Sequence, residues 1–123
     1  MPKPGKTGLI RIIDAQMYTI KGLRAIWKHE AAFRQECALA AVMVPAAFWV
    51  GTDAVQVAML VGVCLIVLIV ELLNSAVETV VDRVGEEMHE LSGRAKDMGS
   101  AAVFVSLCLA GLTWILILWQ RFA

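Results

Sequence analysis

Three long stretches of this sequence carry no charged side chain. They run from Cys37 to Thr52, from Ala54 to Val70 and from Met98 to Gln120. A transmembrane helix needs roughly 18 or more apolar residues, which the third stretch supplies alone and the other two reach with their helix-compatible flanks. Because 59% of the 123 residues are hydrophobic, the chain has more apolar surface than one small soluble core can bury. The sequence therefore predicts an all-α membrane protein, a single integral membrane domain over residues 1–123 with membrane helices at about 31–50, 54–81 and 98–120.

The segment before the first stretch has a different pattern. Over residues 9–28, charged residues alternate with an apolar set that recurs every three or four positions: Leu9, Ile12, Ile13, Met17, Ile20, Leu23 and Trp27. This spacing predicts an N-terminal amphipathic helix that lies in the membrane interface. The alternative is a short helix packed on a cytoplasmic neighbour, because Gly22 weakens the pattern.

The positive charges are distributed unevenly along the chain. Lys and Arg residues precede the first membrane helix and lie between the second and third, whereas the turn from Gly51 to Asp53 has none. By the positive-inside rule, the N-terminus and the second loop are cytoplasmic and the C-terminus is periplasmic, in a bacterial inner membrane. Ser92 and Gly93 are expected to break the helix where the chain reverses in that second loop.

Several functional classes are excluded by composition and motif. The formal net charge of zero is unlike the positive surface of a nucleic-acid-binding protein. Neither a zinc site nor a disulfide framework is predicted, because no CxxC spacing joins the three cysteines, which lie inside the charge-free stretches: Cys37, Cys64 and Cys108. The chain also lacks the HRD and DFG motifs of soluble kinases and a complete phosphate-binding loop.

A polar stripe follows the second charge-free stretch. It consists of Glu71, Asn74, Ser75, Glu78 and Asp82. The last four lie three, four, seven and eleven residues after Glu71, and this spacing places all five on one face of a helix. If the helix starts at Ala54, Glu71 lies roughly 26 Å and Glu78 roughly 36 Å along it, against a hydrocarbon core of about 30 Å. The stripe is therefore predicted to straddle the cytoplasmic boundary.

The stripe has the chemistry that phosphoryl transfer requires. A carboxylate inside or at the edge of hydrocarbon costs roughly 2.5 to 3.5 kcal/mol on insertion scales, and such residues are commonly functional. Paired carboxylates near an amide can hold Mg²⁺, and one of them can accept a proton from a hydroxyl group. The alternative is a packing role, in which Glu71 pairs with a cation of another helix and Asp82 pairs with a cation such as Arg83.

Two smaller clusters flank the stripe. Residues 89–97 combine cations with backbone donors at a helix start, which suits phosphate oxygens, but a basic loop beside a membrane also serves simply to set topology. Glu30, Arg34 and Glu36 lie just ahead of the first charge-free stretch, and Glu30 and Arg34 have the spacing of an i,i+4 ion pair.

Three motifs span the polar parts of the chain: EAAFRQE at residues 30–36, ELLNSAVE at 71–78 with VDR at 81–83, and HELSGRAKDMGSAA at 89–102. Through these motifs the sequence resembles the prokaryotic diacylglycerol kinase family, most closely its Gram-negative members. The resemblance implies a lipid kinase that transfers the γ-phosphoryl group of Mg-ATP to diacylglycerol, giving phosphatidic acid at the cytoplasmic surface. It also implies a homotrimer with an interfacial helix, three spans per subunit and active sites shared between subunits.

The resemblance also implies a set of site residues. Glu78 corresponds to the catalytic base and a Mg²⁺ ligand, and Glu30 to a second Mg²⁺ ligand. Catalysis would further involve Glu71, Asn74 and Lys96. The implied nucleotide contacts are Arg11, Tyr18, Glu30, Glu78, Glu87, His89, Glu90, Lys96 and Asp97, and the implied lipid contacts are Glu36, Trp49, Glu71 and Ser100. The N-terminal helix departs from the best-known members at Asp14, Gln16 and Met17, where they have a lysine and small residues, so no phosphate contact is expected at Asp14.

Two other functions stay open at this point. A kinase of the same family that acts on another lipid alcohol, such as undecaprenol, would have similar catalytic residues. A small transporter or structural membrane protein would use Glu71 and Glu78 as proton or cation sites and would have no use for the loop around Lys96.

Overall fold

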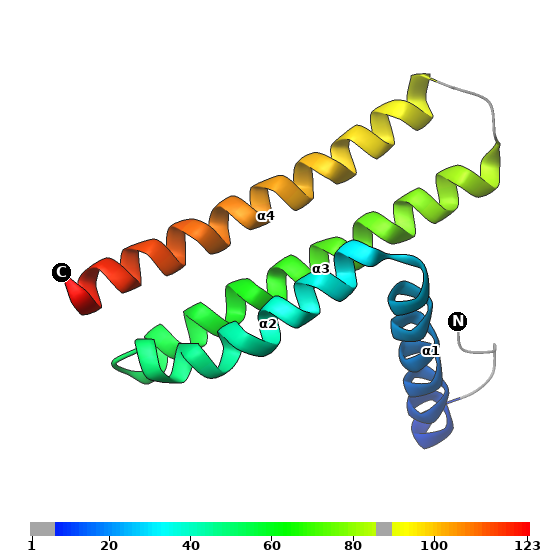
Figure 1. Ribbon diagram of the computed structural model, residues 1–123. Coiled ribbons are helices and arrows are strands. Elements are labelled where there is room, and N and C mark those ends of the chain that lie inside the picture. The colour runs from blue at the N-terminus through cyan, green and yellow to red at the C-terminus, as the bar shows by residue number, and fades with distance from the viewer. Residues whose placement is uncertain (1–6, 86–89) are drawn as a thin grey trace. The chain divides into compact units, whose positions relative to one another are not determined.

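The computed structural model describes residues 7–85 and 90–123, and all regular secondary structure in these residues is α-helical. Four helices follow one another: α1 (Gly8–His29), α2 (Ala31–Val50), α3 (Ala54–Val84) and α4 (Glu90–Phe122) (Figure 1). They belong to two compact units, one containing α1 and ending at Ala31, the other containing α2, α3 and α4. The predicted all-α class is confirmed.

The first unit is a single helix with little packing of its own. Ile26 is its one buried residue among those described, and large apolar side chains such as Ile13 and Ile20 are half exposed. Lys28 and His29 lie in the last turn, where positive charge interacts favourably with the helix dipole. An apolar face that this unit leaves exposed needs a lipid or protein surface to cover it.

The other three helices are long and apolar enough to cross a membrane. At 1.5 Å per residue, the 31 residues of α3 and the 33 residues of α4 extend about 46 Å and about 50 Å, well beyond a hydrocarbon core of about 30 Å. Part of each helix must therefore project into the interface or the water beyond it.

The expected helix break at Ser92 and Gly93 is wrong. Helix α4 begins at Glu90, eight residues before Met98, and runs through both positions. Two local effects favour the helix: an acidic residue in the first turn complements the helix dipole, and the carboxylate of Glu90 lies 3.5 Å from Arg94 one turn later. A single interior glycine costs only about 1 kcal/mol against alanine, which is not enough to end a helix of this length.

A compact turn joins α2 to α3. Asp53 caps α3, because its Oδ1 accepts a hydrogen bond of 2.8 Å from the backbone N–H of Gln56. Gly51 precedes it at a close approach, where an added Cβ would lie 2.7 Å from Val57 Cγ2 and 3.0 Å from Val57 N. The turn thus requires a residue without a side chain at position 51.

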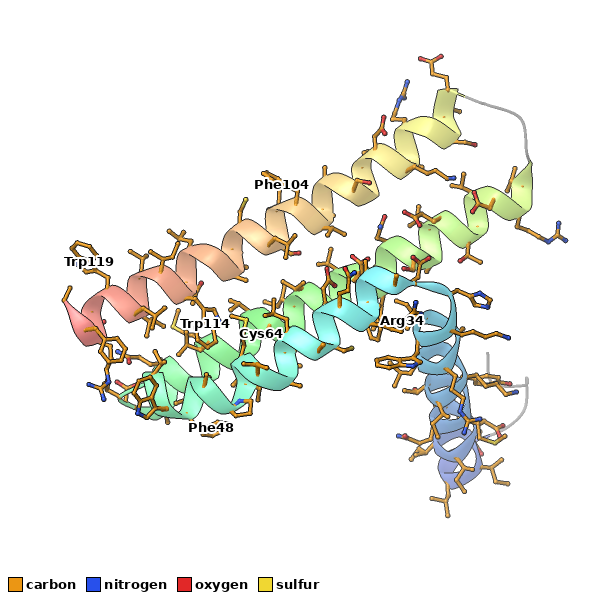
Figure 2. All side chains as sticks on the ribbon, in the orientation of Figure 1. Arg34, Phe48, Cys64, Phe104, Trp114 and Trp119 are labelled. Carbon is orange, nitrogen blue, oxygen red and sulfur yellow. The ribbon has the colours of Figure 1, made fainter. Side chains whose placement is uncertain are left out.

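Near this turn, α2, α3 and α4 share an apolar core. Its buried members are Ala47, Val50, Leu60, Val63, Cys64, Trp114 and Ile117. The indole Nε1 of Trp114 donates a hydrogen bond of 3.2 Å to the backbone oxygen of Leu60, which ties α4 to α3. Trp114 and Cys64 point into the space between α3 and α4, whereas Phe104 and Trp119 point away from α3 (Figure 2). We call this part of the α3–α4 hairpin the apolar end.

Candidate active site

The predicted polar stripe lies on the half of α3 that leads away from the apolar end. Its members become more exposed along the helix: Glu71 and Ser75 are buried at 5% and 8% exposure, Asn74 and Glu78 are partly buried, and Asp82 is exposed. The stripe therefore leads from the packed interior of the bundle to its surface. Together with residues 96–100 of α4, it forms what we call the polar end of the hairpin.

Within the stripe, Asn74 and Glu78 are directly bonded. The side-chain Nδ2 of Asn74 donates a hydrogen bond of 3.2 Å to Glu78 Oε1, one helical turn further on. A carboxylate that accepts a bond from a neutral amide keeps its second oxygen and its remaining lone pairs available. Glu78 is therefore oriented by its neighbour and still able to accept a proton or ligate a cation.

Lys96 of α4 completes this end of the site from the other side. Its Nζ lies 2.7 Å from Asp82 Oδ1, and its positive charge also interacts with the carboxylate of Glu78. Both partners of the ion pair are about half exposed or more, so the pair adds little to folding. Its consequence is positional, because it holds a cation at the position one helical turn beyond Glu78.

A second pair of carboxylates lies deeper in the bundle. Glu36 of α2 and Glu71 of α3 are close enough for their charges to interact. Glu36 Oε2 is buried and has no hydrogen-bond partner among the described residues. Two acidic groups at this depth make a polar position inside a largely apolar interior.

An apolar groove opens beside Glu36. It has a volume of about 210 Å³ and is lined by residues of α2, α3 and α4, including Met43, Val67, Leu107 and Trp114. Among its described lining residues, Glu36 is the only one with a charge. A groove of this kind suits a hydrocarbon chain that carries a polar group at one end.

The other predicted site residues are spread over the chain. Asp97 and Ser100 are exposed on α4 beside Lys96, and Glu90 is exposed at the start of α4 in its pair with Arg94. Arg11 and Tyr18 are exposed on α1, and Glu30 follows the end of α1. Glu87 and His89 lie outside the described residues.

The structure does not bring Trp49 to the polar end. It lies in the last turn of α2, beside the turn to α3, with its ring 5.5 Å from that of Phe122 at the far end of α4. It is exposed at 67%, and its lipid contact stays a prediction.

Two features of the polar end escaped the sequence analysis. Lys96 pairs with Asp82, although Arg83 is the nearer cation in sequence. Gly99 lies directly against the carboxamide of Asn74. No sequence signal marks either contact, since the register between α3 and α4 decides which residues face one another.

The oxygen donors at this end fit a magnesium ion only in part. Among the described residues, no group of three His, Cys, Asp or Glu side chains gathers into a complete metal cage. Glu78 offers a free oxygen, and Asn74 Oδ1 is buried without a hydrogen-bond partner among the described residues. Because Mg²⁺ keeps several waters and takes most of its other ligands from substrate phosphates, one or two carboxylates suffice for it.

The chain matches known proteins along most of its length. Residues 17–118 match the family model described as prokaryotic diacylglycerol kinase. The diacylglycerol kinase of Escherichia coli strain K12 is 53% identical over 116 residues, which cover 94% of this chain and 95% of that protein. The diacylglycerol kinase of Haemophilus influenzae is 50% identical, over 88% of this chain and 92% of that protein. That of Pseudomonas aeruginosa is also 50% identical, over 95% of this chain and 95% of that protein. The resemblance seen in the motifs is confirmed: the chain belongs to the prokaryotic diacylglycerol kinase family.

Proposed function

We propose that the chain is an ATP-dependent lipid kinase that phosphorylates diacylglycerol to phosphatidic acid at the cytoplasmic face of a bacterial inner membrane. The observation that carries this proposal is that Asn74 orients Glu78 while Lys96 of the neighbouring helix pairs with Asp82, one turn further along the same face of α3. A proton acceptor and a positive charge beside one another, where long apolar helices become polar, are what a lipid hydroxyl and a triphosphate require.

In the reaction, Glu78 accepts the proton of the primary hydroxyl of the diglyceride. The hydroxyl oxygen forms a bond to the γ-phosphorus, and the bond from that phosphorus to the β–γ bridging oxygen breaks, so that ADP leaves. Lys96 stabilises the negative charge on the transferring group and can exchange Asp82 for phosphate oxygens, because the pair is exposed. Asn74 keeps the acceptor oxygen of Glu78 in place.

Magnesium is the metal that this chemistry uses. Glu78 would hold it, together with Glu30 as the family resemblance implies, and the bound ion would neutralise charge on the β- and γ-phosphates. The remaining nucleotide contacts stay predictions from the resemblance: Arg11, Tyr18, Glu87, His89, Glu90 and Asp97.

The lipid is expected to enter from the bilayer. The groove beside Glu36 suits an acyl chain, and the partly buried carboxylate of Glu36 and the buried carboxylate of Glu71 provide hydrogen-bond acceptors for the polar part of the diglyceride. Ser100, on the exposed face of α4, can contact the same headgroup. A substrate delivered sideways by the membrane needs no deep enclosed pocket, which explains how so short a chain can be an enzyme.

The membrane arrangement follows from charge and exposed apolar surface. Helix α1 lies in the interface, and the loop between α3 and α4 is cytoplasmic, so the C-terminus is periplasmic. A homotrimer would cover part of the apolar surface of α3 and α4. In shared active sites, Glu30 and the contacts on α1 would reach the nucleotide from a neighbouring subunit or from the same one.

The test is an assay with purified protein in detergent micelles. Mg-ATP is supplied with diacylglycerol, with undecaprenol, or with neither, and the phosphorylated lipid is quantified. We expect rapid formation of phosphatidic acid with diacylglycerol and little product with undecaprenol. The reverse preference would make the chain an undecaprenol kinase, and no lipid-dependent ATP consumption would reject a kinase function.

A further inference from the structure

Gly99 of α4 faces the side chain of Asn74 on α3. A Cβ added at Gly99 would collide with Asn74 Oδ1, and the next nearest atoms are Asn74 Cγ at 3.2 Å and Asn74 Cβ at 3.9 Å. All three nearest atoms thus belong to one side chain. The space that a side chain at position 99 would need is taken up by the carboxamide of Asn74.

This carboxamide is the group that orients Glu78. Its Nδ2 donates to Glu78 Oε1, while its Oδ1 is buried against Gly99 with no hydrogen-bond partner among the described residues. Because a carboxamide is planar, the position of Oδ1 fixes the direction in which Nδ2 points. The backbone of α4 therefore determines, through one contact, where the amide donates its hydrogen bond.

Other helical glycines in this unit lack such a contact. At Gly62, Gly93 and Gly111, a Cβ would meet nothing within 4 Å. Alanine is the better helix former at an interior position, so a glycine there lowers helix stability without a local gain. At position 99 the missing side chain has a definite use, since glycine leaves room for the Asn74 carboxamide in the position that it occupies.

We propose that Gly99 is a positioning residue for phosphoryl transfer, which admits the Asn74 carboxamide between α3 and α4 and thereby aims it at Glu78. The inference rests on the proposed role of Glu78 as the proton acceptor. Gly99 touches no reacting atom and acts only through Asn74. Its replacement should therefore slow the chemical step and leave substrate binding nearly unchanged, because the Lys96–Asp82 pair and the groove beside Glu36 do not include it.

The experiment compares Gly99→Ala with Gly62→Ala, the same change on α3 where a Cβ meets open space. Initial rates are measured in mixed micelles while ATP and diacylglycerol are varied in turn. For Gly99→Ala, kcat should fall about 10- to 100-fold, since misplacing a catalytic group by an ångström has an effect of that size. Both KM values should stay within about threefold, and Gly62→Ala should match the wild type.

A double-mutant cycle separates this role from a general packing defect. If Gly99 acts through Asn74, then Gly99→Ala causes no further loss of kcat in an Asn74→Ala background, where the collision is absent. The same cycle is read in the thermal unfolding midpoint, which does not depend on residual activity. Gly99→Ala should raise the unfolding midpoint only in the Asn74→Ala background. In that background the collision is absent, and alanine only improves the helix propensity of α4.

Wild-type kcat for Gly99→Ala, or equal effects of Gly99→Ala in both backgrounds, would overturn the inference. A wild-type protein that forms no phosphatidic acid would instead overturn the proposed function, and the unfolding cycle would still report whether positions 74 and 99 are coupled.

Discussion

The two ends of the α3–α4 hairpin are held together by different interactions. At the apolar end, buried side chains from three helices pack together and Trp114 bonds to the backbone of Leu60. At the polar end, the links between α3 and α4 are an exposed ion pair and the approach of Gly99 to Asn74. The apolar end is built for stability, and the polar end leaves charged groups free to exchange partners.

The difference between the two ends predicts which substitutions should lower activity and which should lower stability. Glu78, Asp82 and Lys96 of the polar end can be replaced with little loss of packing, because these side chains are partly or largely exposed. A change at the apolar end removes contacts that nothing else replaces. Activity and stability should therefore respond separately to substitutions at the two ends.

The largest effect is expected for Glu78→Gln at the polar end. The amide keeps the size of the side chain but cannot accept the hydroxyl proton, so kcat for phosphatidic acid formation should fall roughly 10³-fold, within the range for loss of a general base. The unfolding midpoint should change little. Asp53→Asn is the control, since it makes the same chemical change at the other end of α3 and asparagine still caps a helix. If the Glu78→Gln variant turned over at a near-normal rate, Glu78 would not be the general base.

Lys96→Met should have the next largest effect. Methionine keeps the length of the side chain and removes the charge, so kcat/KM for ATP should fall about 10²-fold, as for the loss of one charge-stabilising group. Arg121→Met is the matched control, because it removes a cation from the other end of α4, where Arg121 lies over the ring of Phe122. Equal losses of kcat/KM for the two variants would mean that ATP use depends on the net charge of α4 and not on the position of Lys96.

The stripe and the helices were predictable because their signals are local. The offsets of Glu71, Asn74 and Glu78 place them on one face of any α-helix, whatever surrounds it. The apolar stretches predicted three membrane-length helices for the same reason. The helix break expected at Ser92 and Gly93 was wrong because the tendency of single residues to end a helix is weaker than the tendency of a long helix to continue.

The contacts across the hairpin were not predictable from the sequence. Whether Lys96 meets Asp82 and whether Gly99 meets Asn74 depends on the register of α4 along α3. Hydropathy leaves this register open, because the apolar side chains of α4 are distributed around the helix and mark no single face. The family motifs contain all four residues but do not say which of them touch.

At the apolar end, Gly51→Ala tests whether the turn between α2 and α3 affects stability without affecting activity. The new Cβ would lie 2.7 Å from Val57 Cγ2 and 3.1 Å from the backbone oxygen of Ala47, so the turn must shift. We expect the free energy of unfolding to fall by about 1 to 3 kcal/mol, as for other overpacked sites. Folded protein should keep its kcat, and Gly62→Ala should not share the loss of stability. A drop in kcat of the folded variant would show that the two ends are coupled.

Trp114→Phe is expected to have the smallest effect and isolates one interaction of the apolar end. Phenylalanine keeps an aromatic ring in the core but cannot donate to the backbone oxygen of Leu60. In a membrane the unfolded chain also finds hydrogen-bond partners, so the loss should be only about 0.6 kcal/mol in unfolding free energy, measured by denaturant titration in micelles. Trp119→Phe, which changes an exposed tryptophan on the same helix, should have no such effect. Because Trp114 also lines the groove beside Glu36, the KM for diacylglycerol can change in this variant. If Trp114→Phe instead lowered kcat at saturating lipid while leaving stability intact, the hydrogen bond would be transmitting the position of α4 to the polar end, and the division between a stabilising end and a catalytic end would fail.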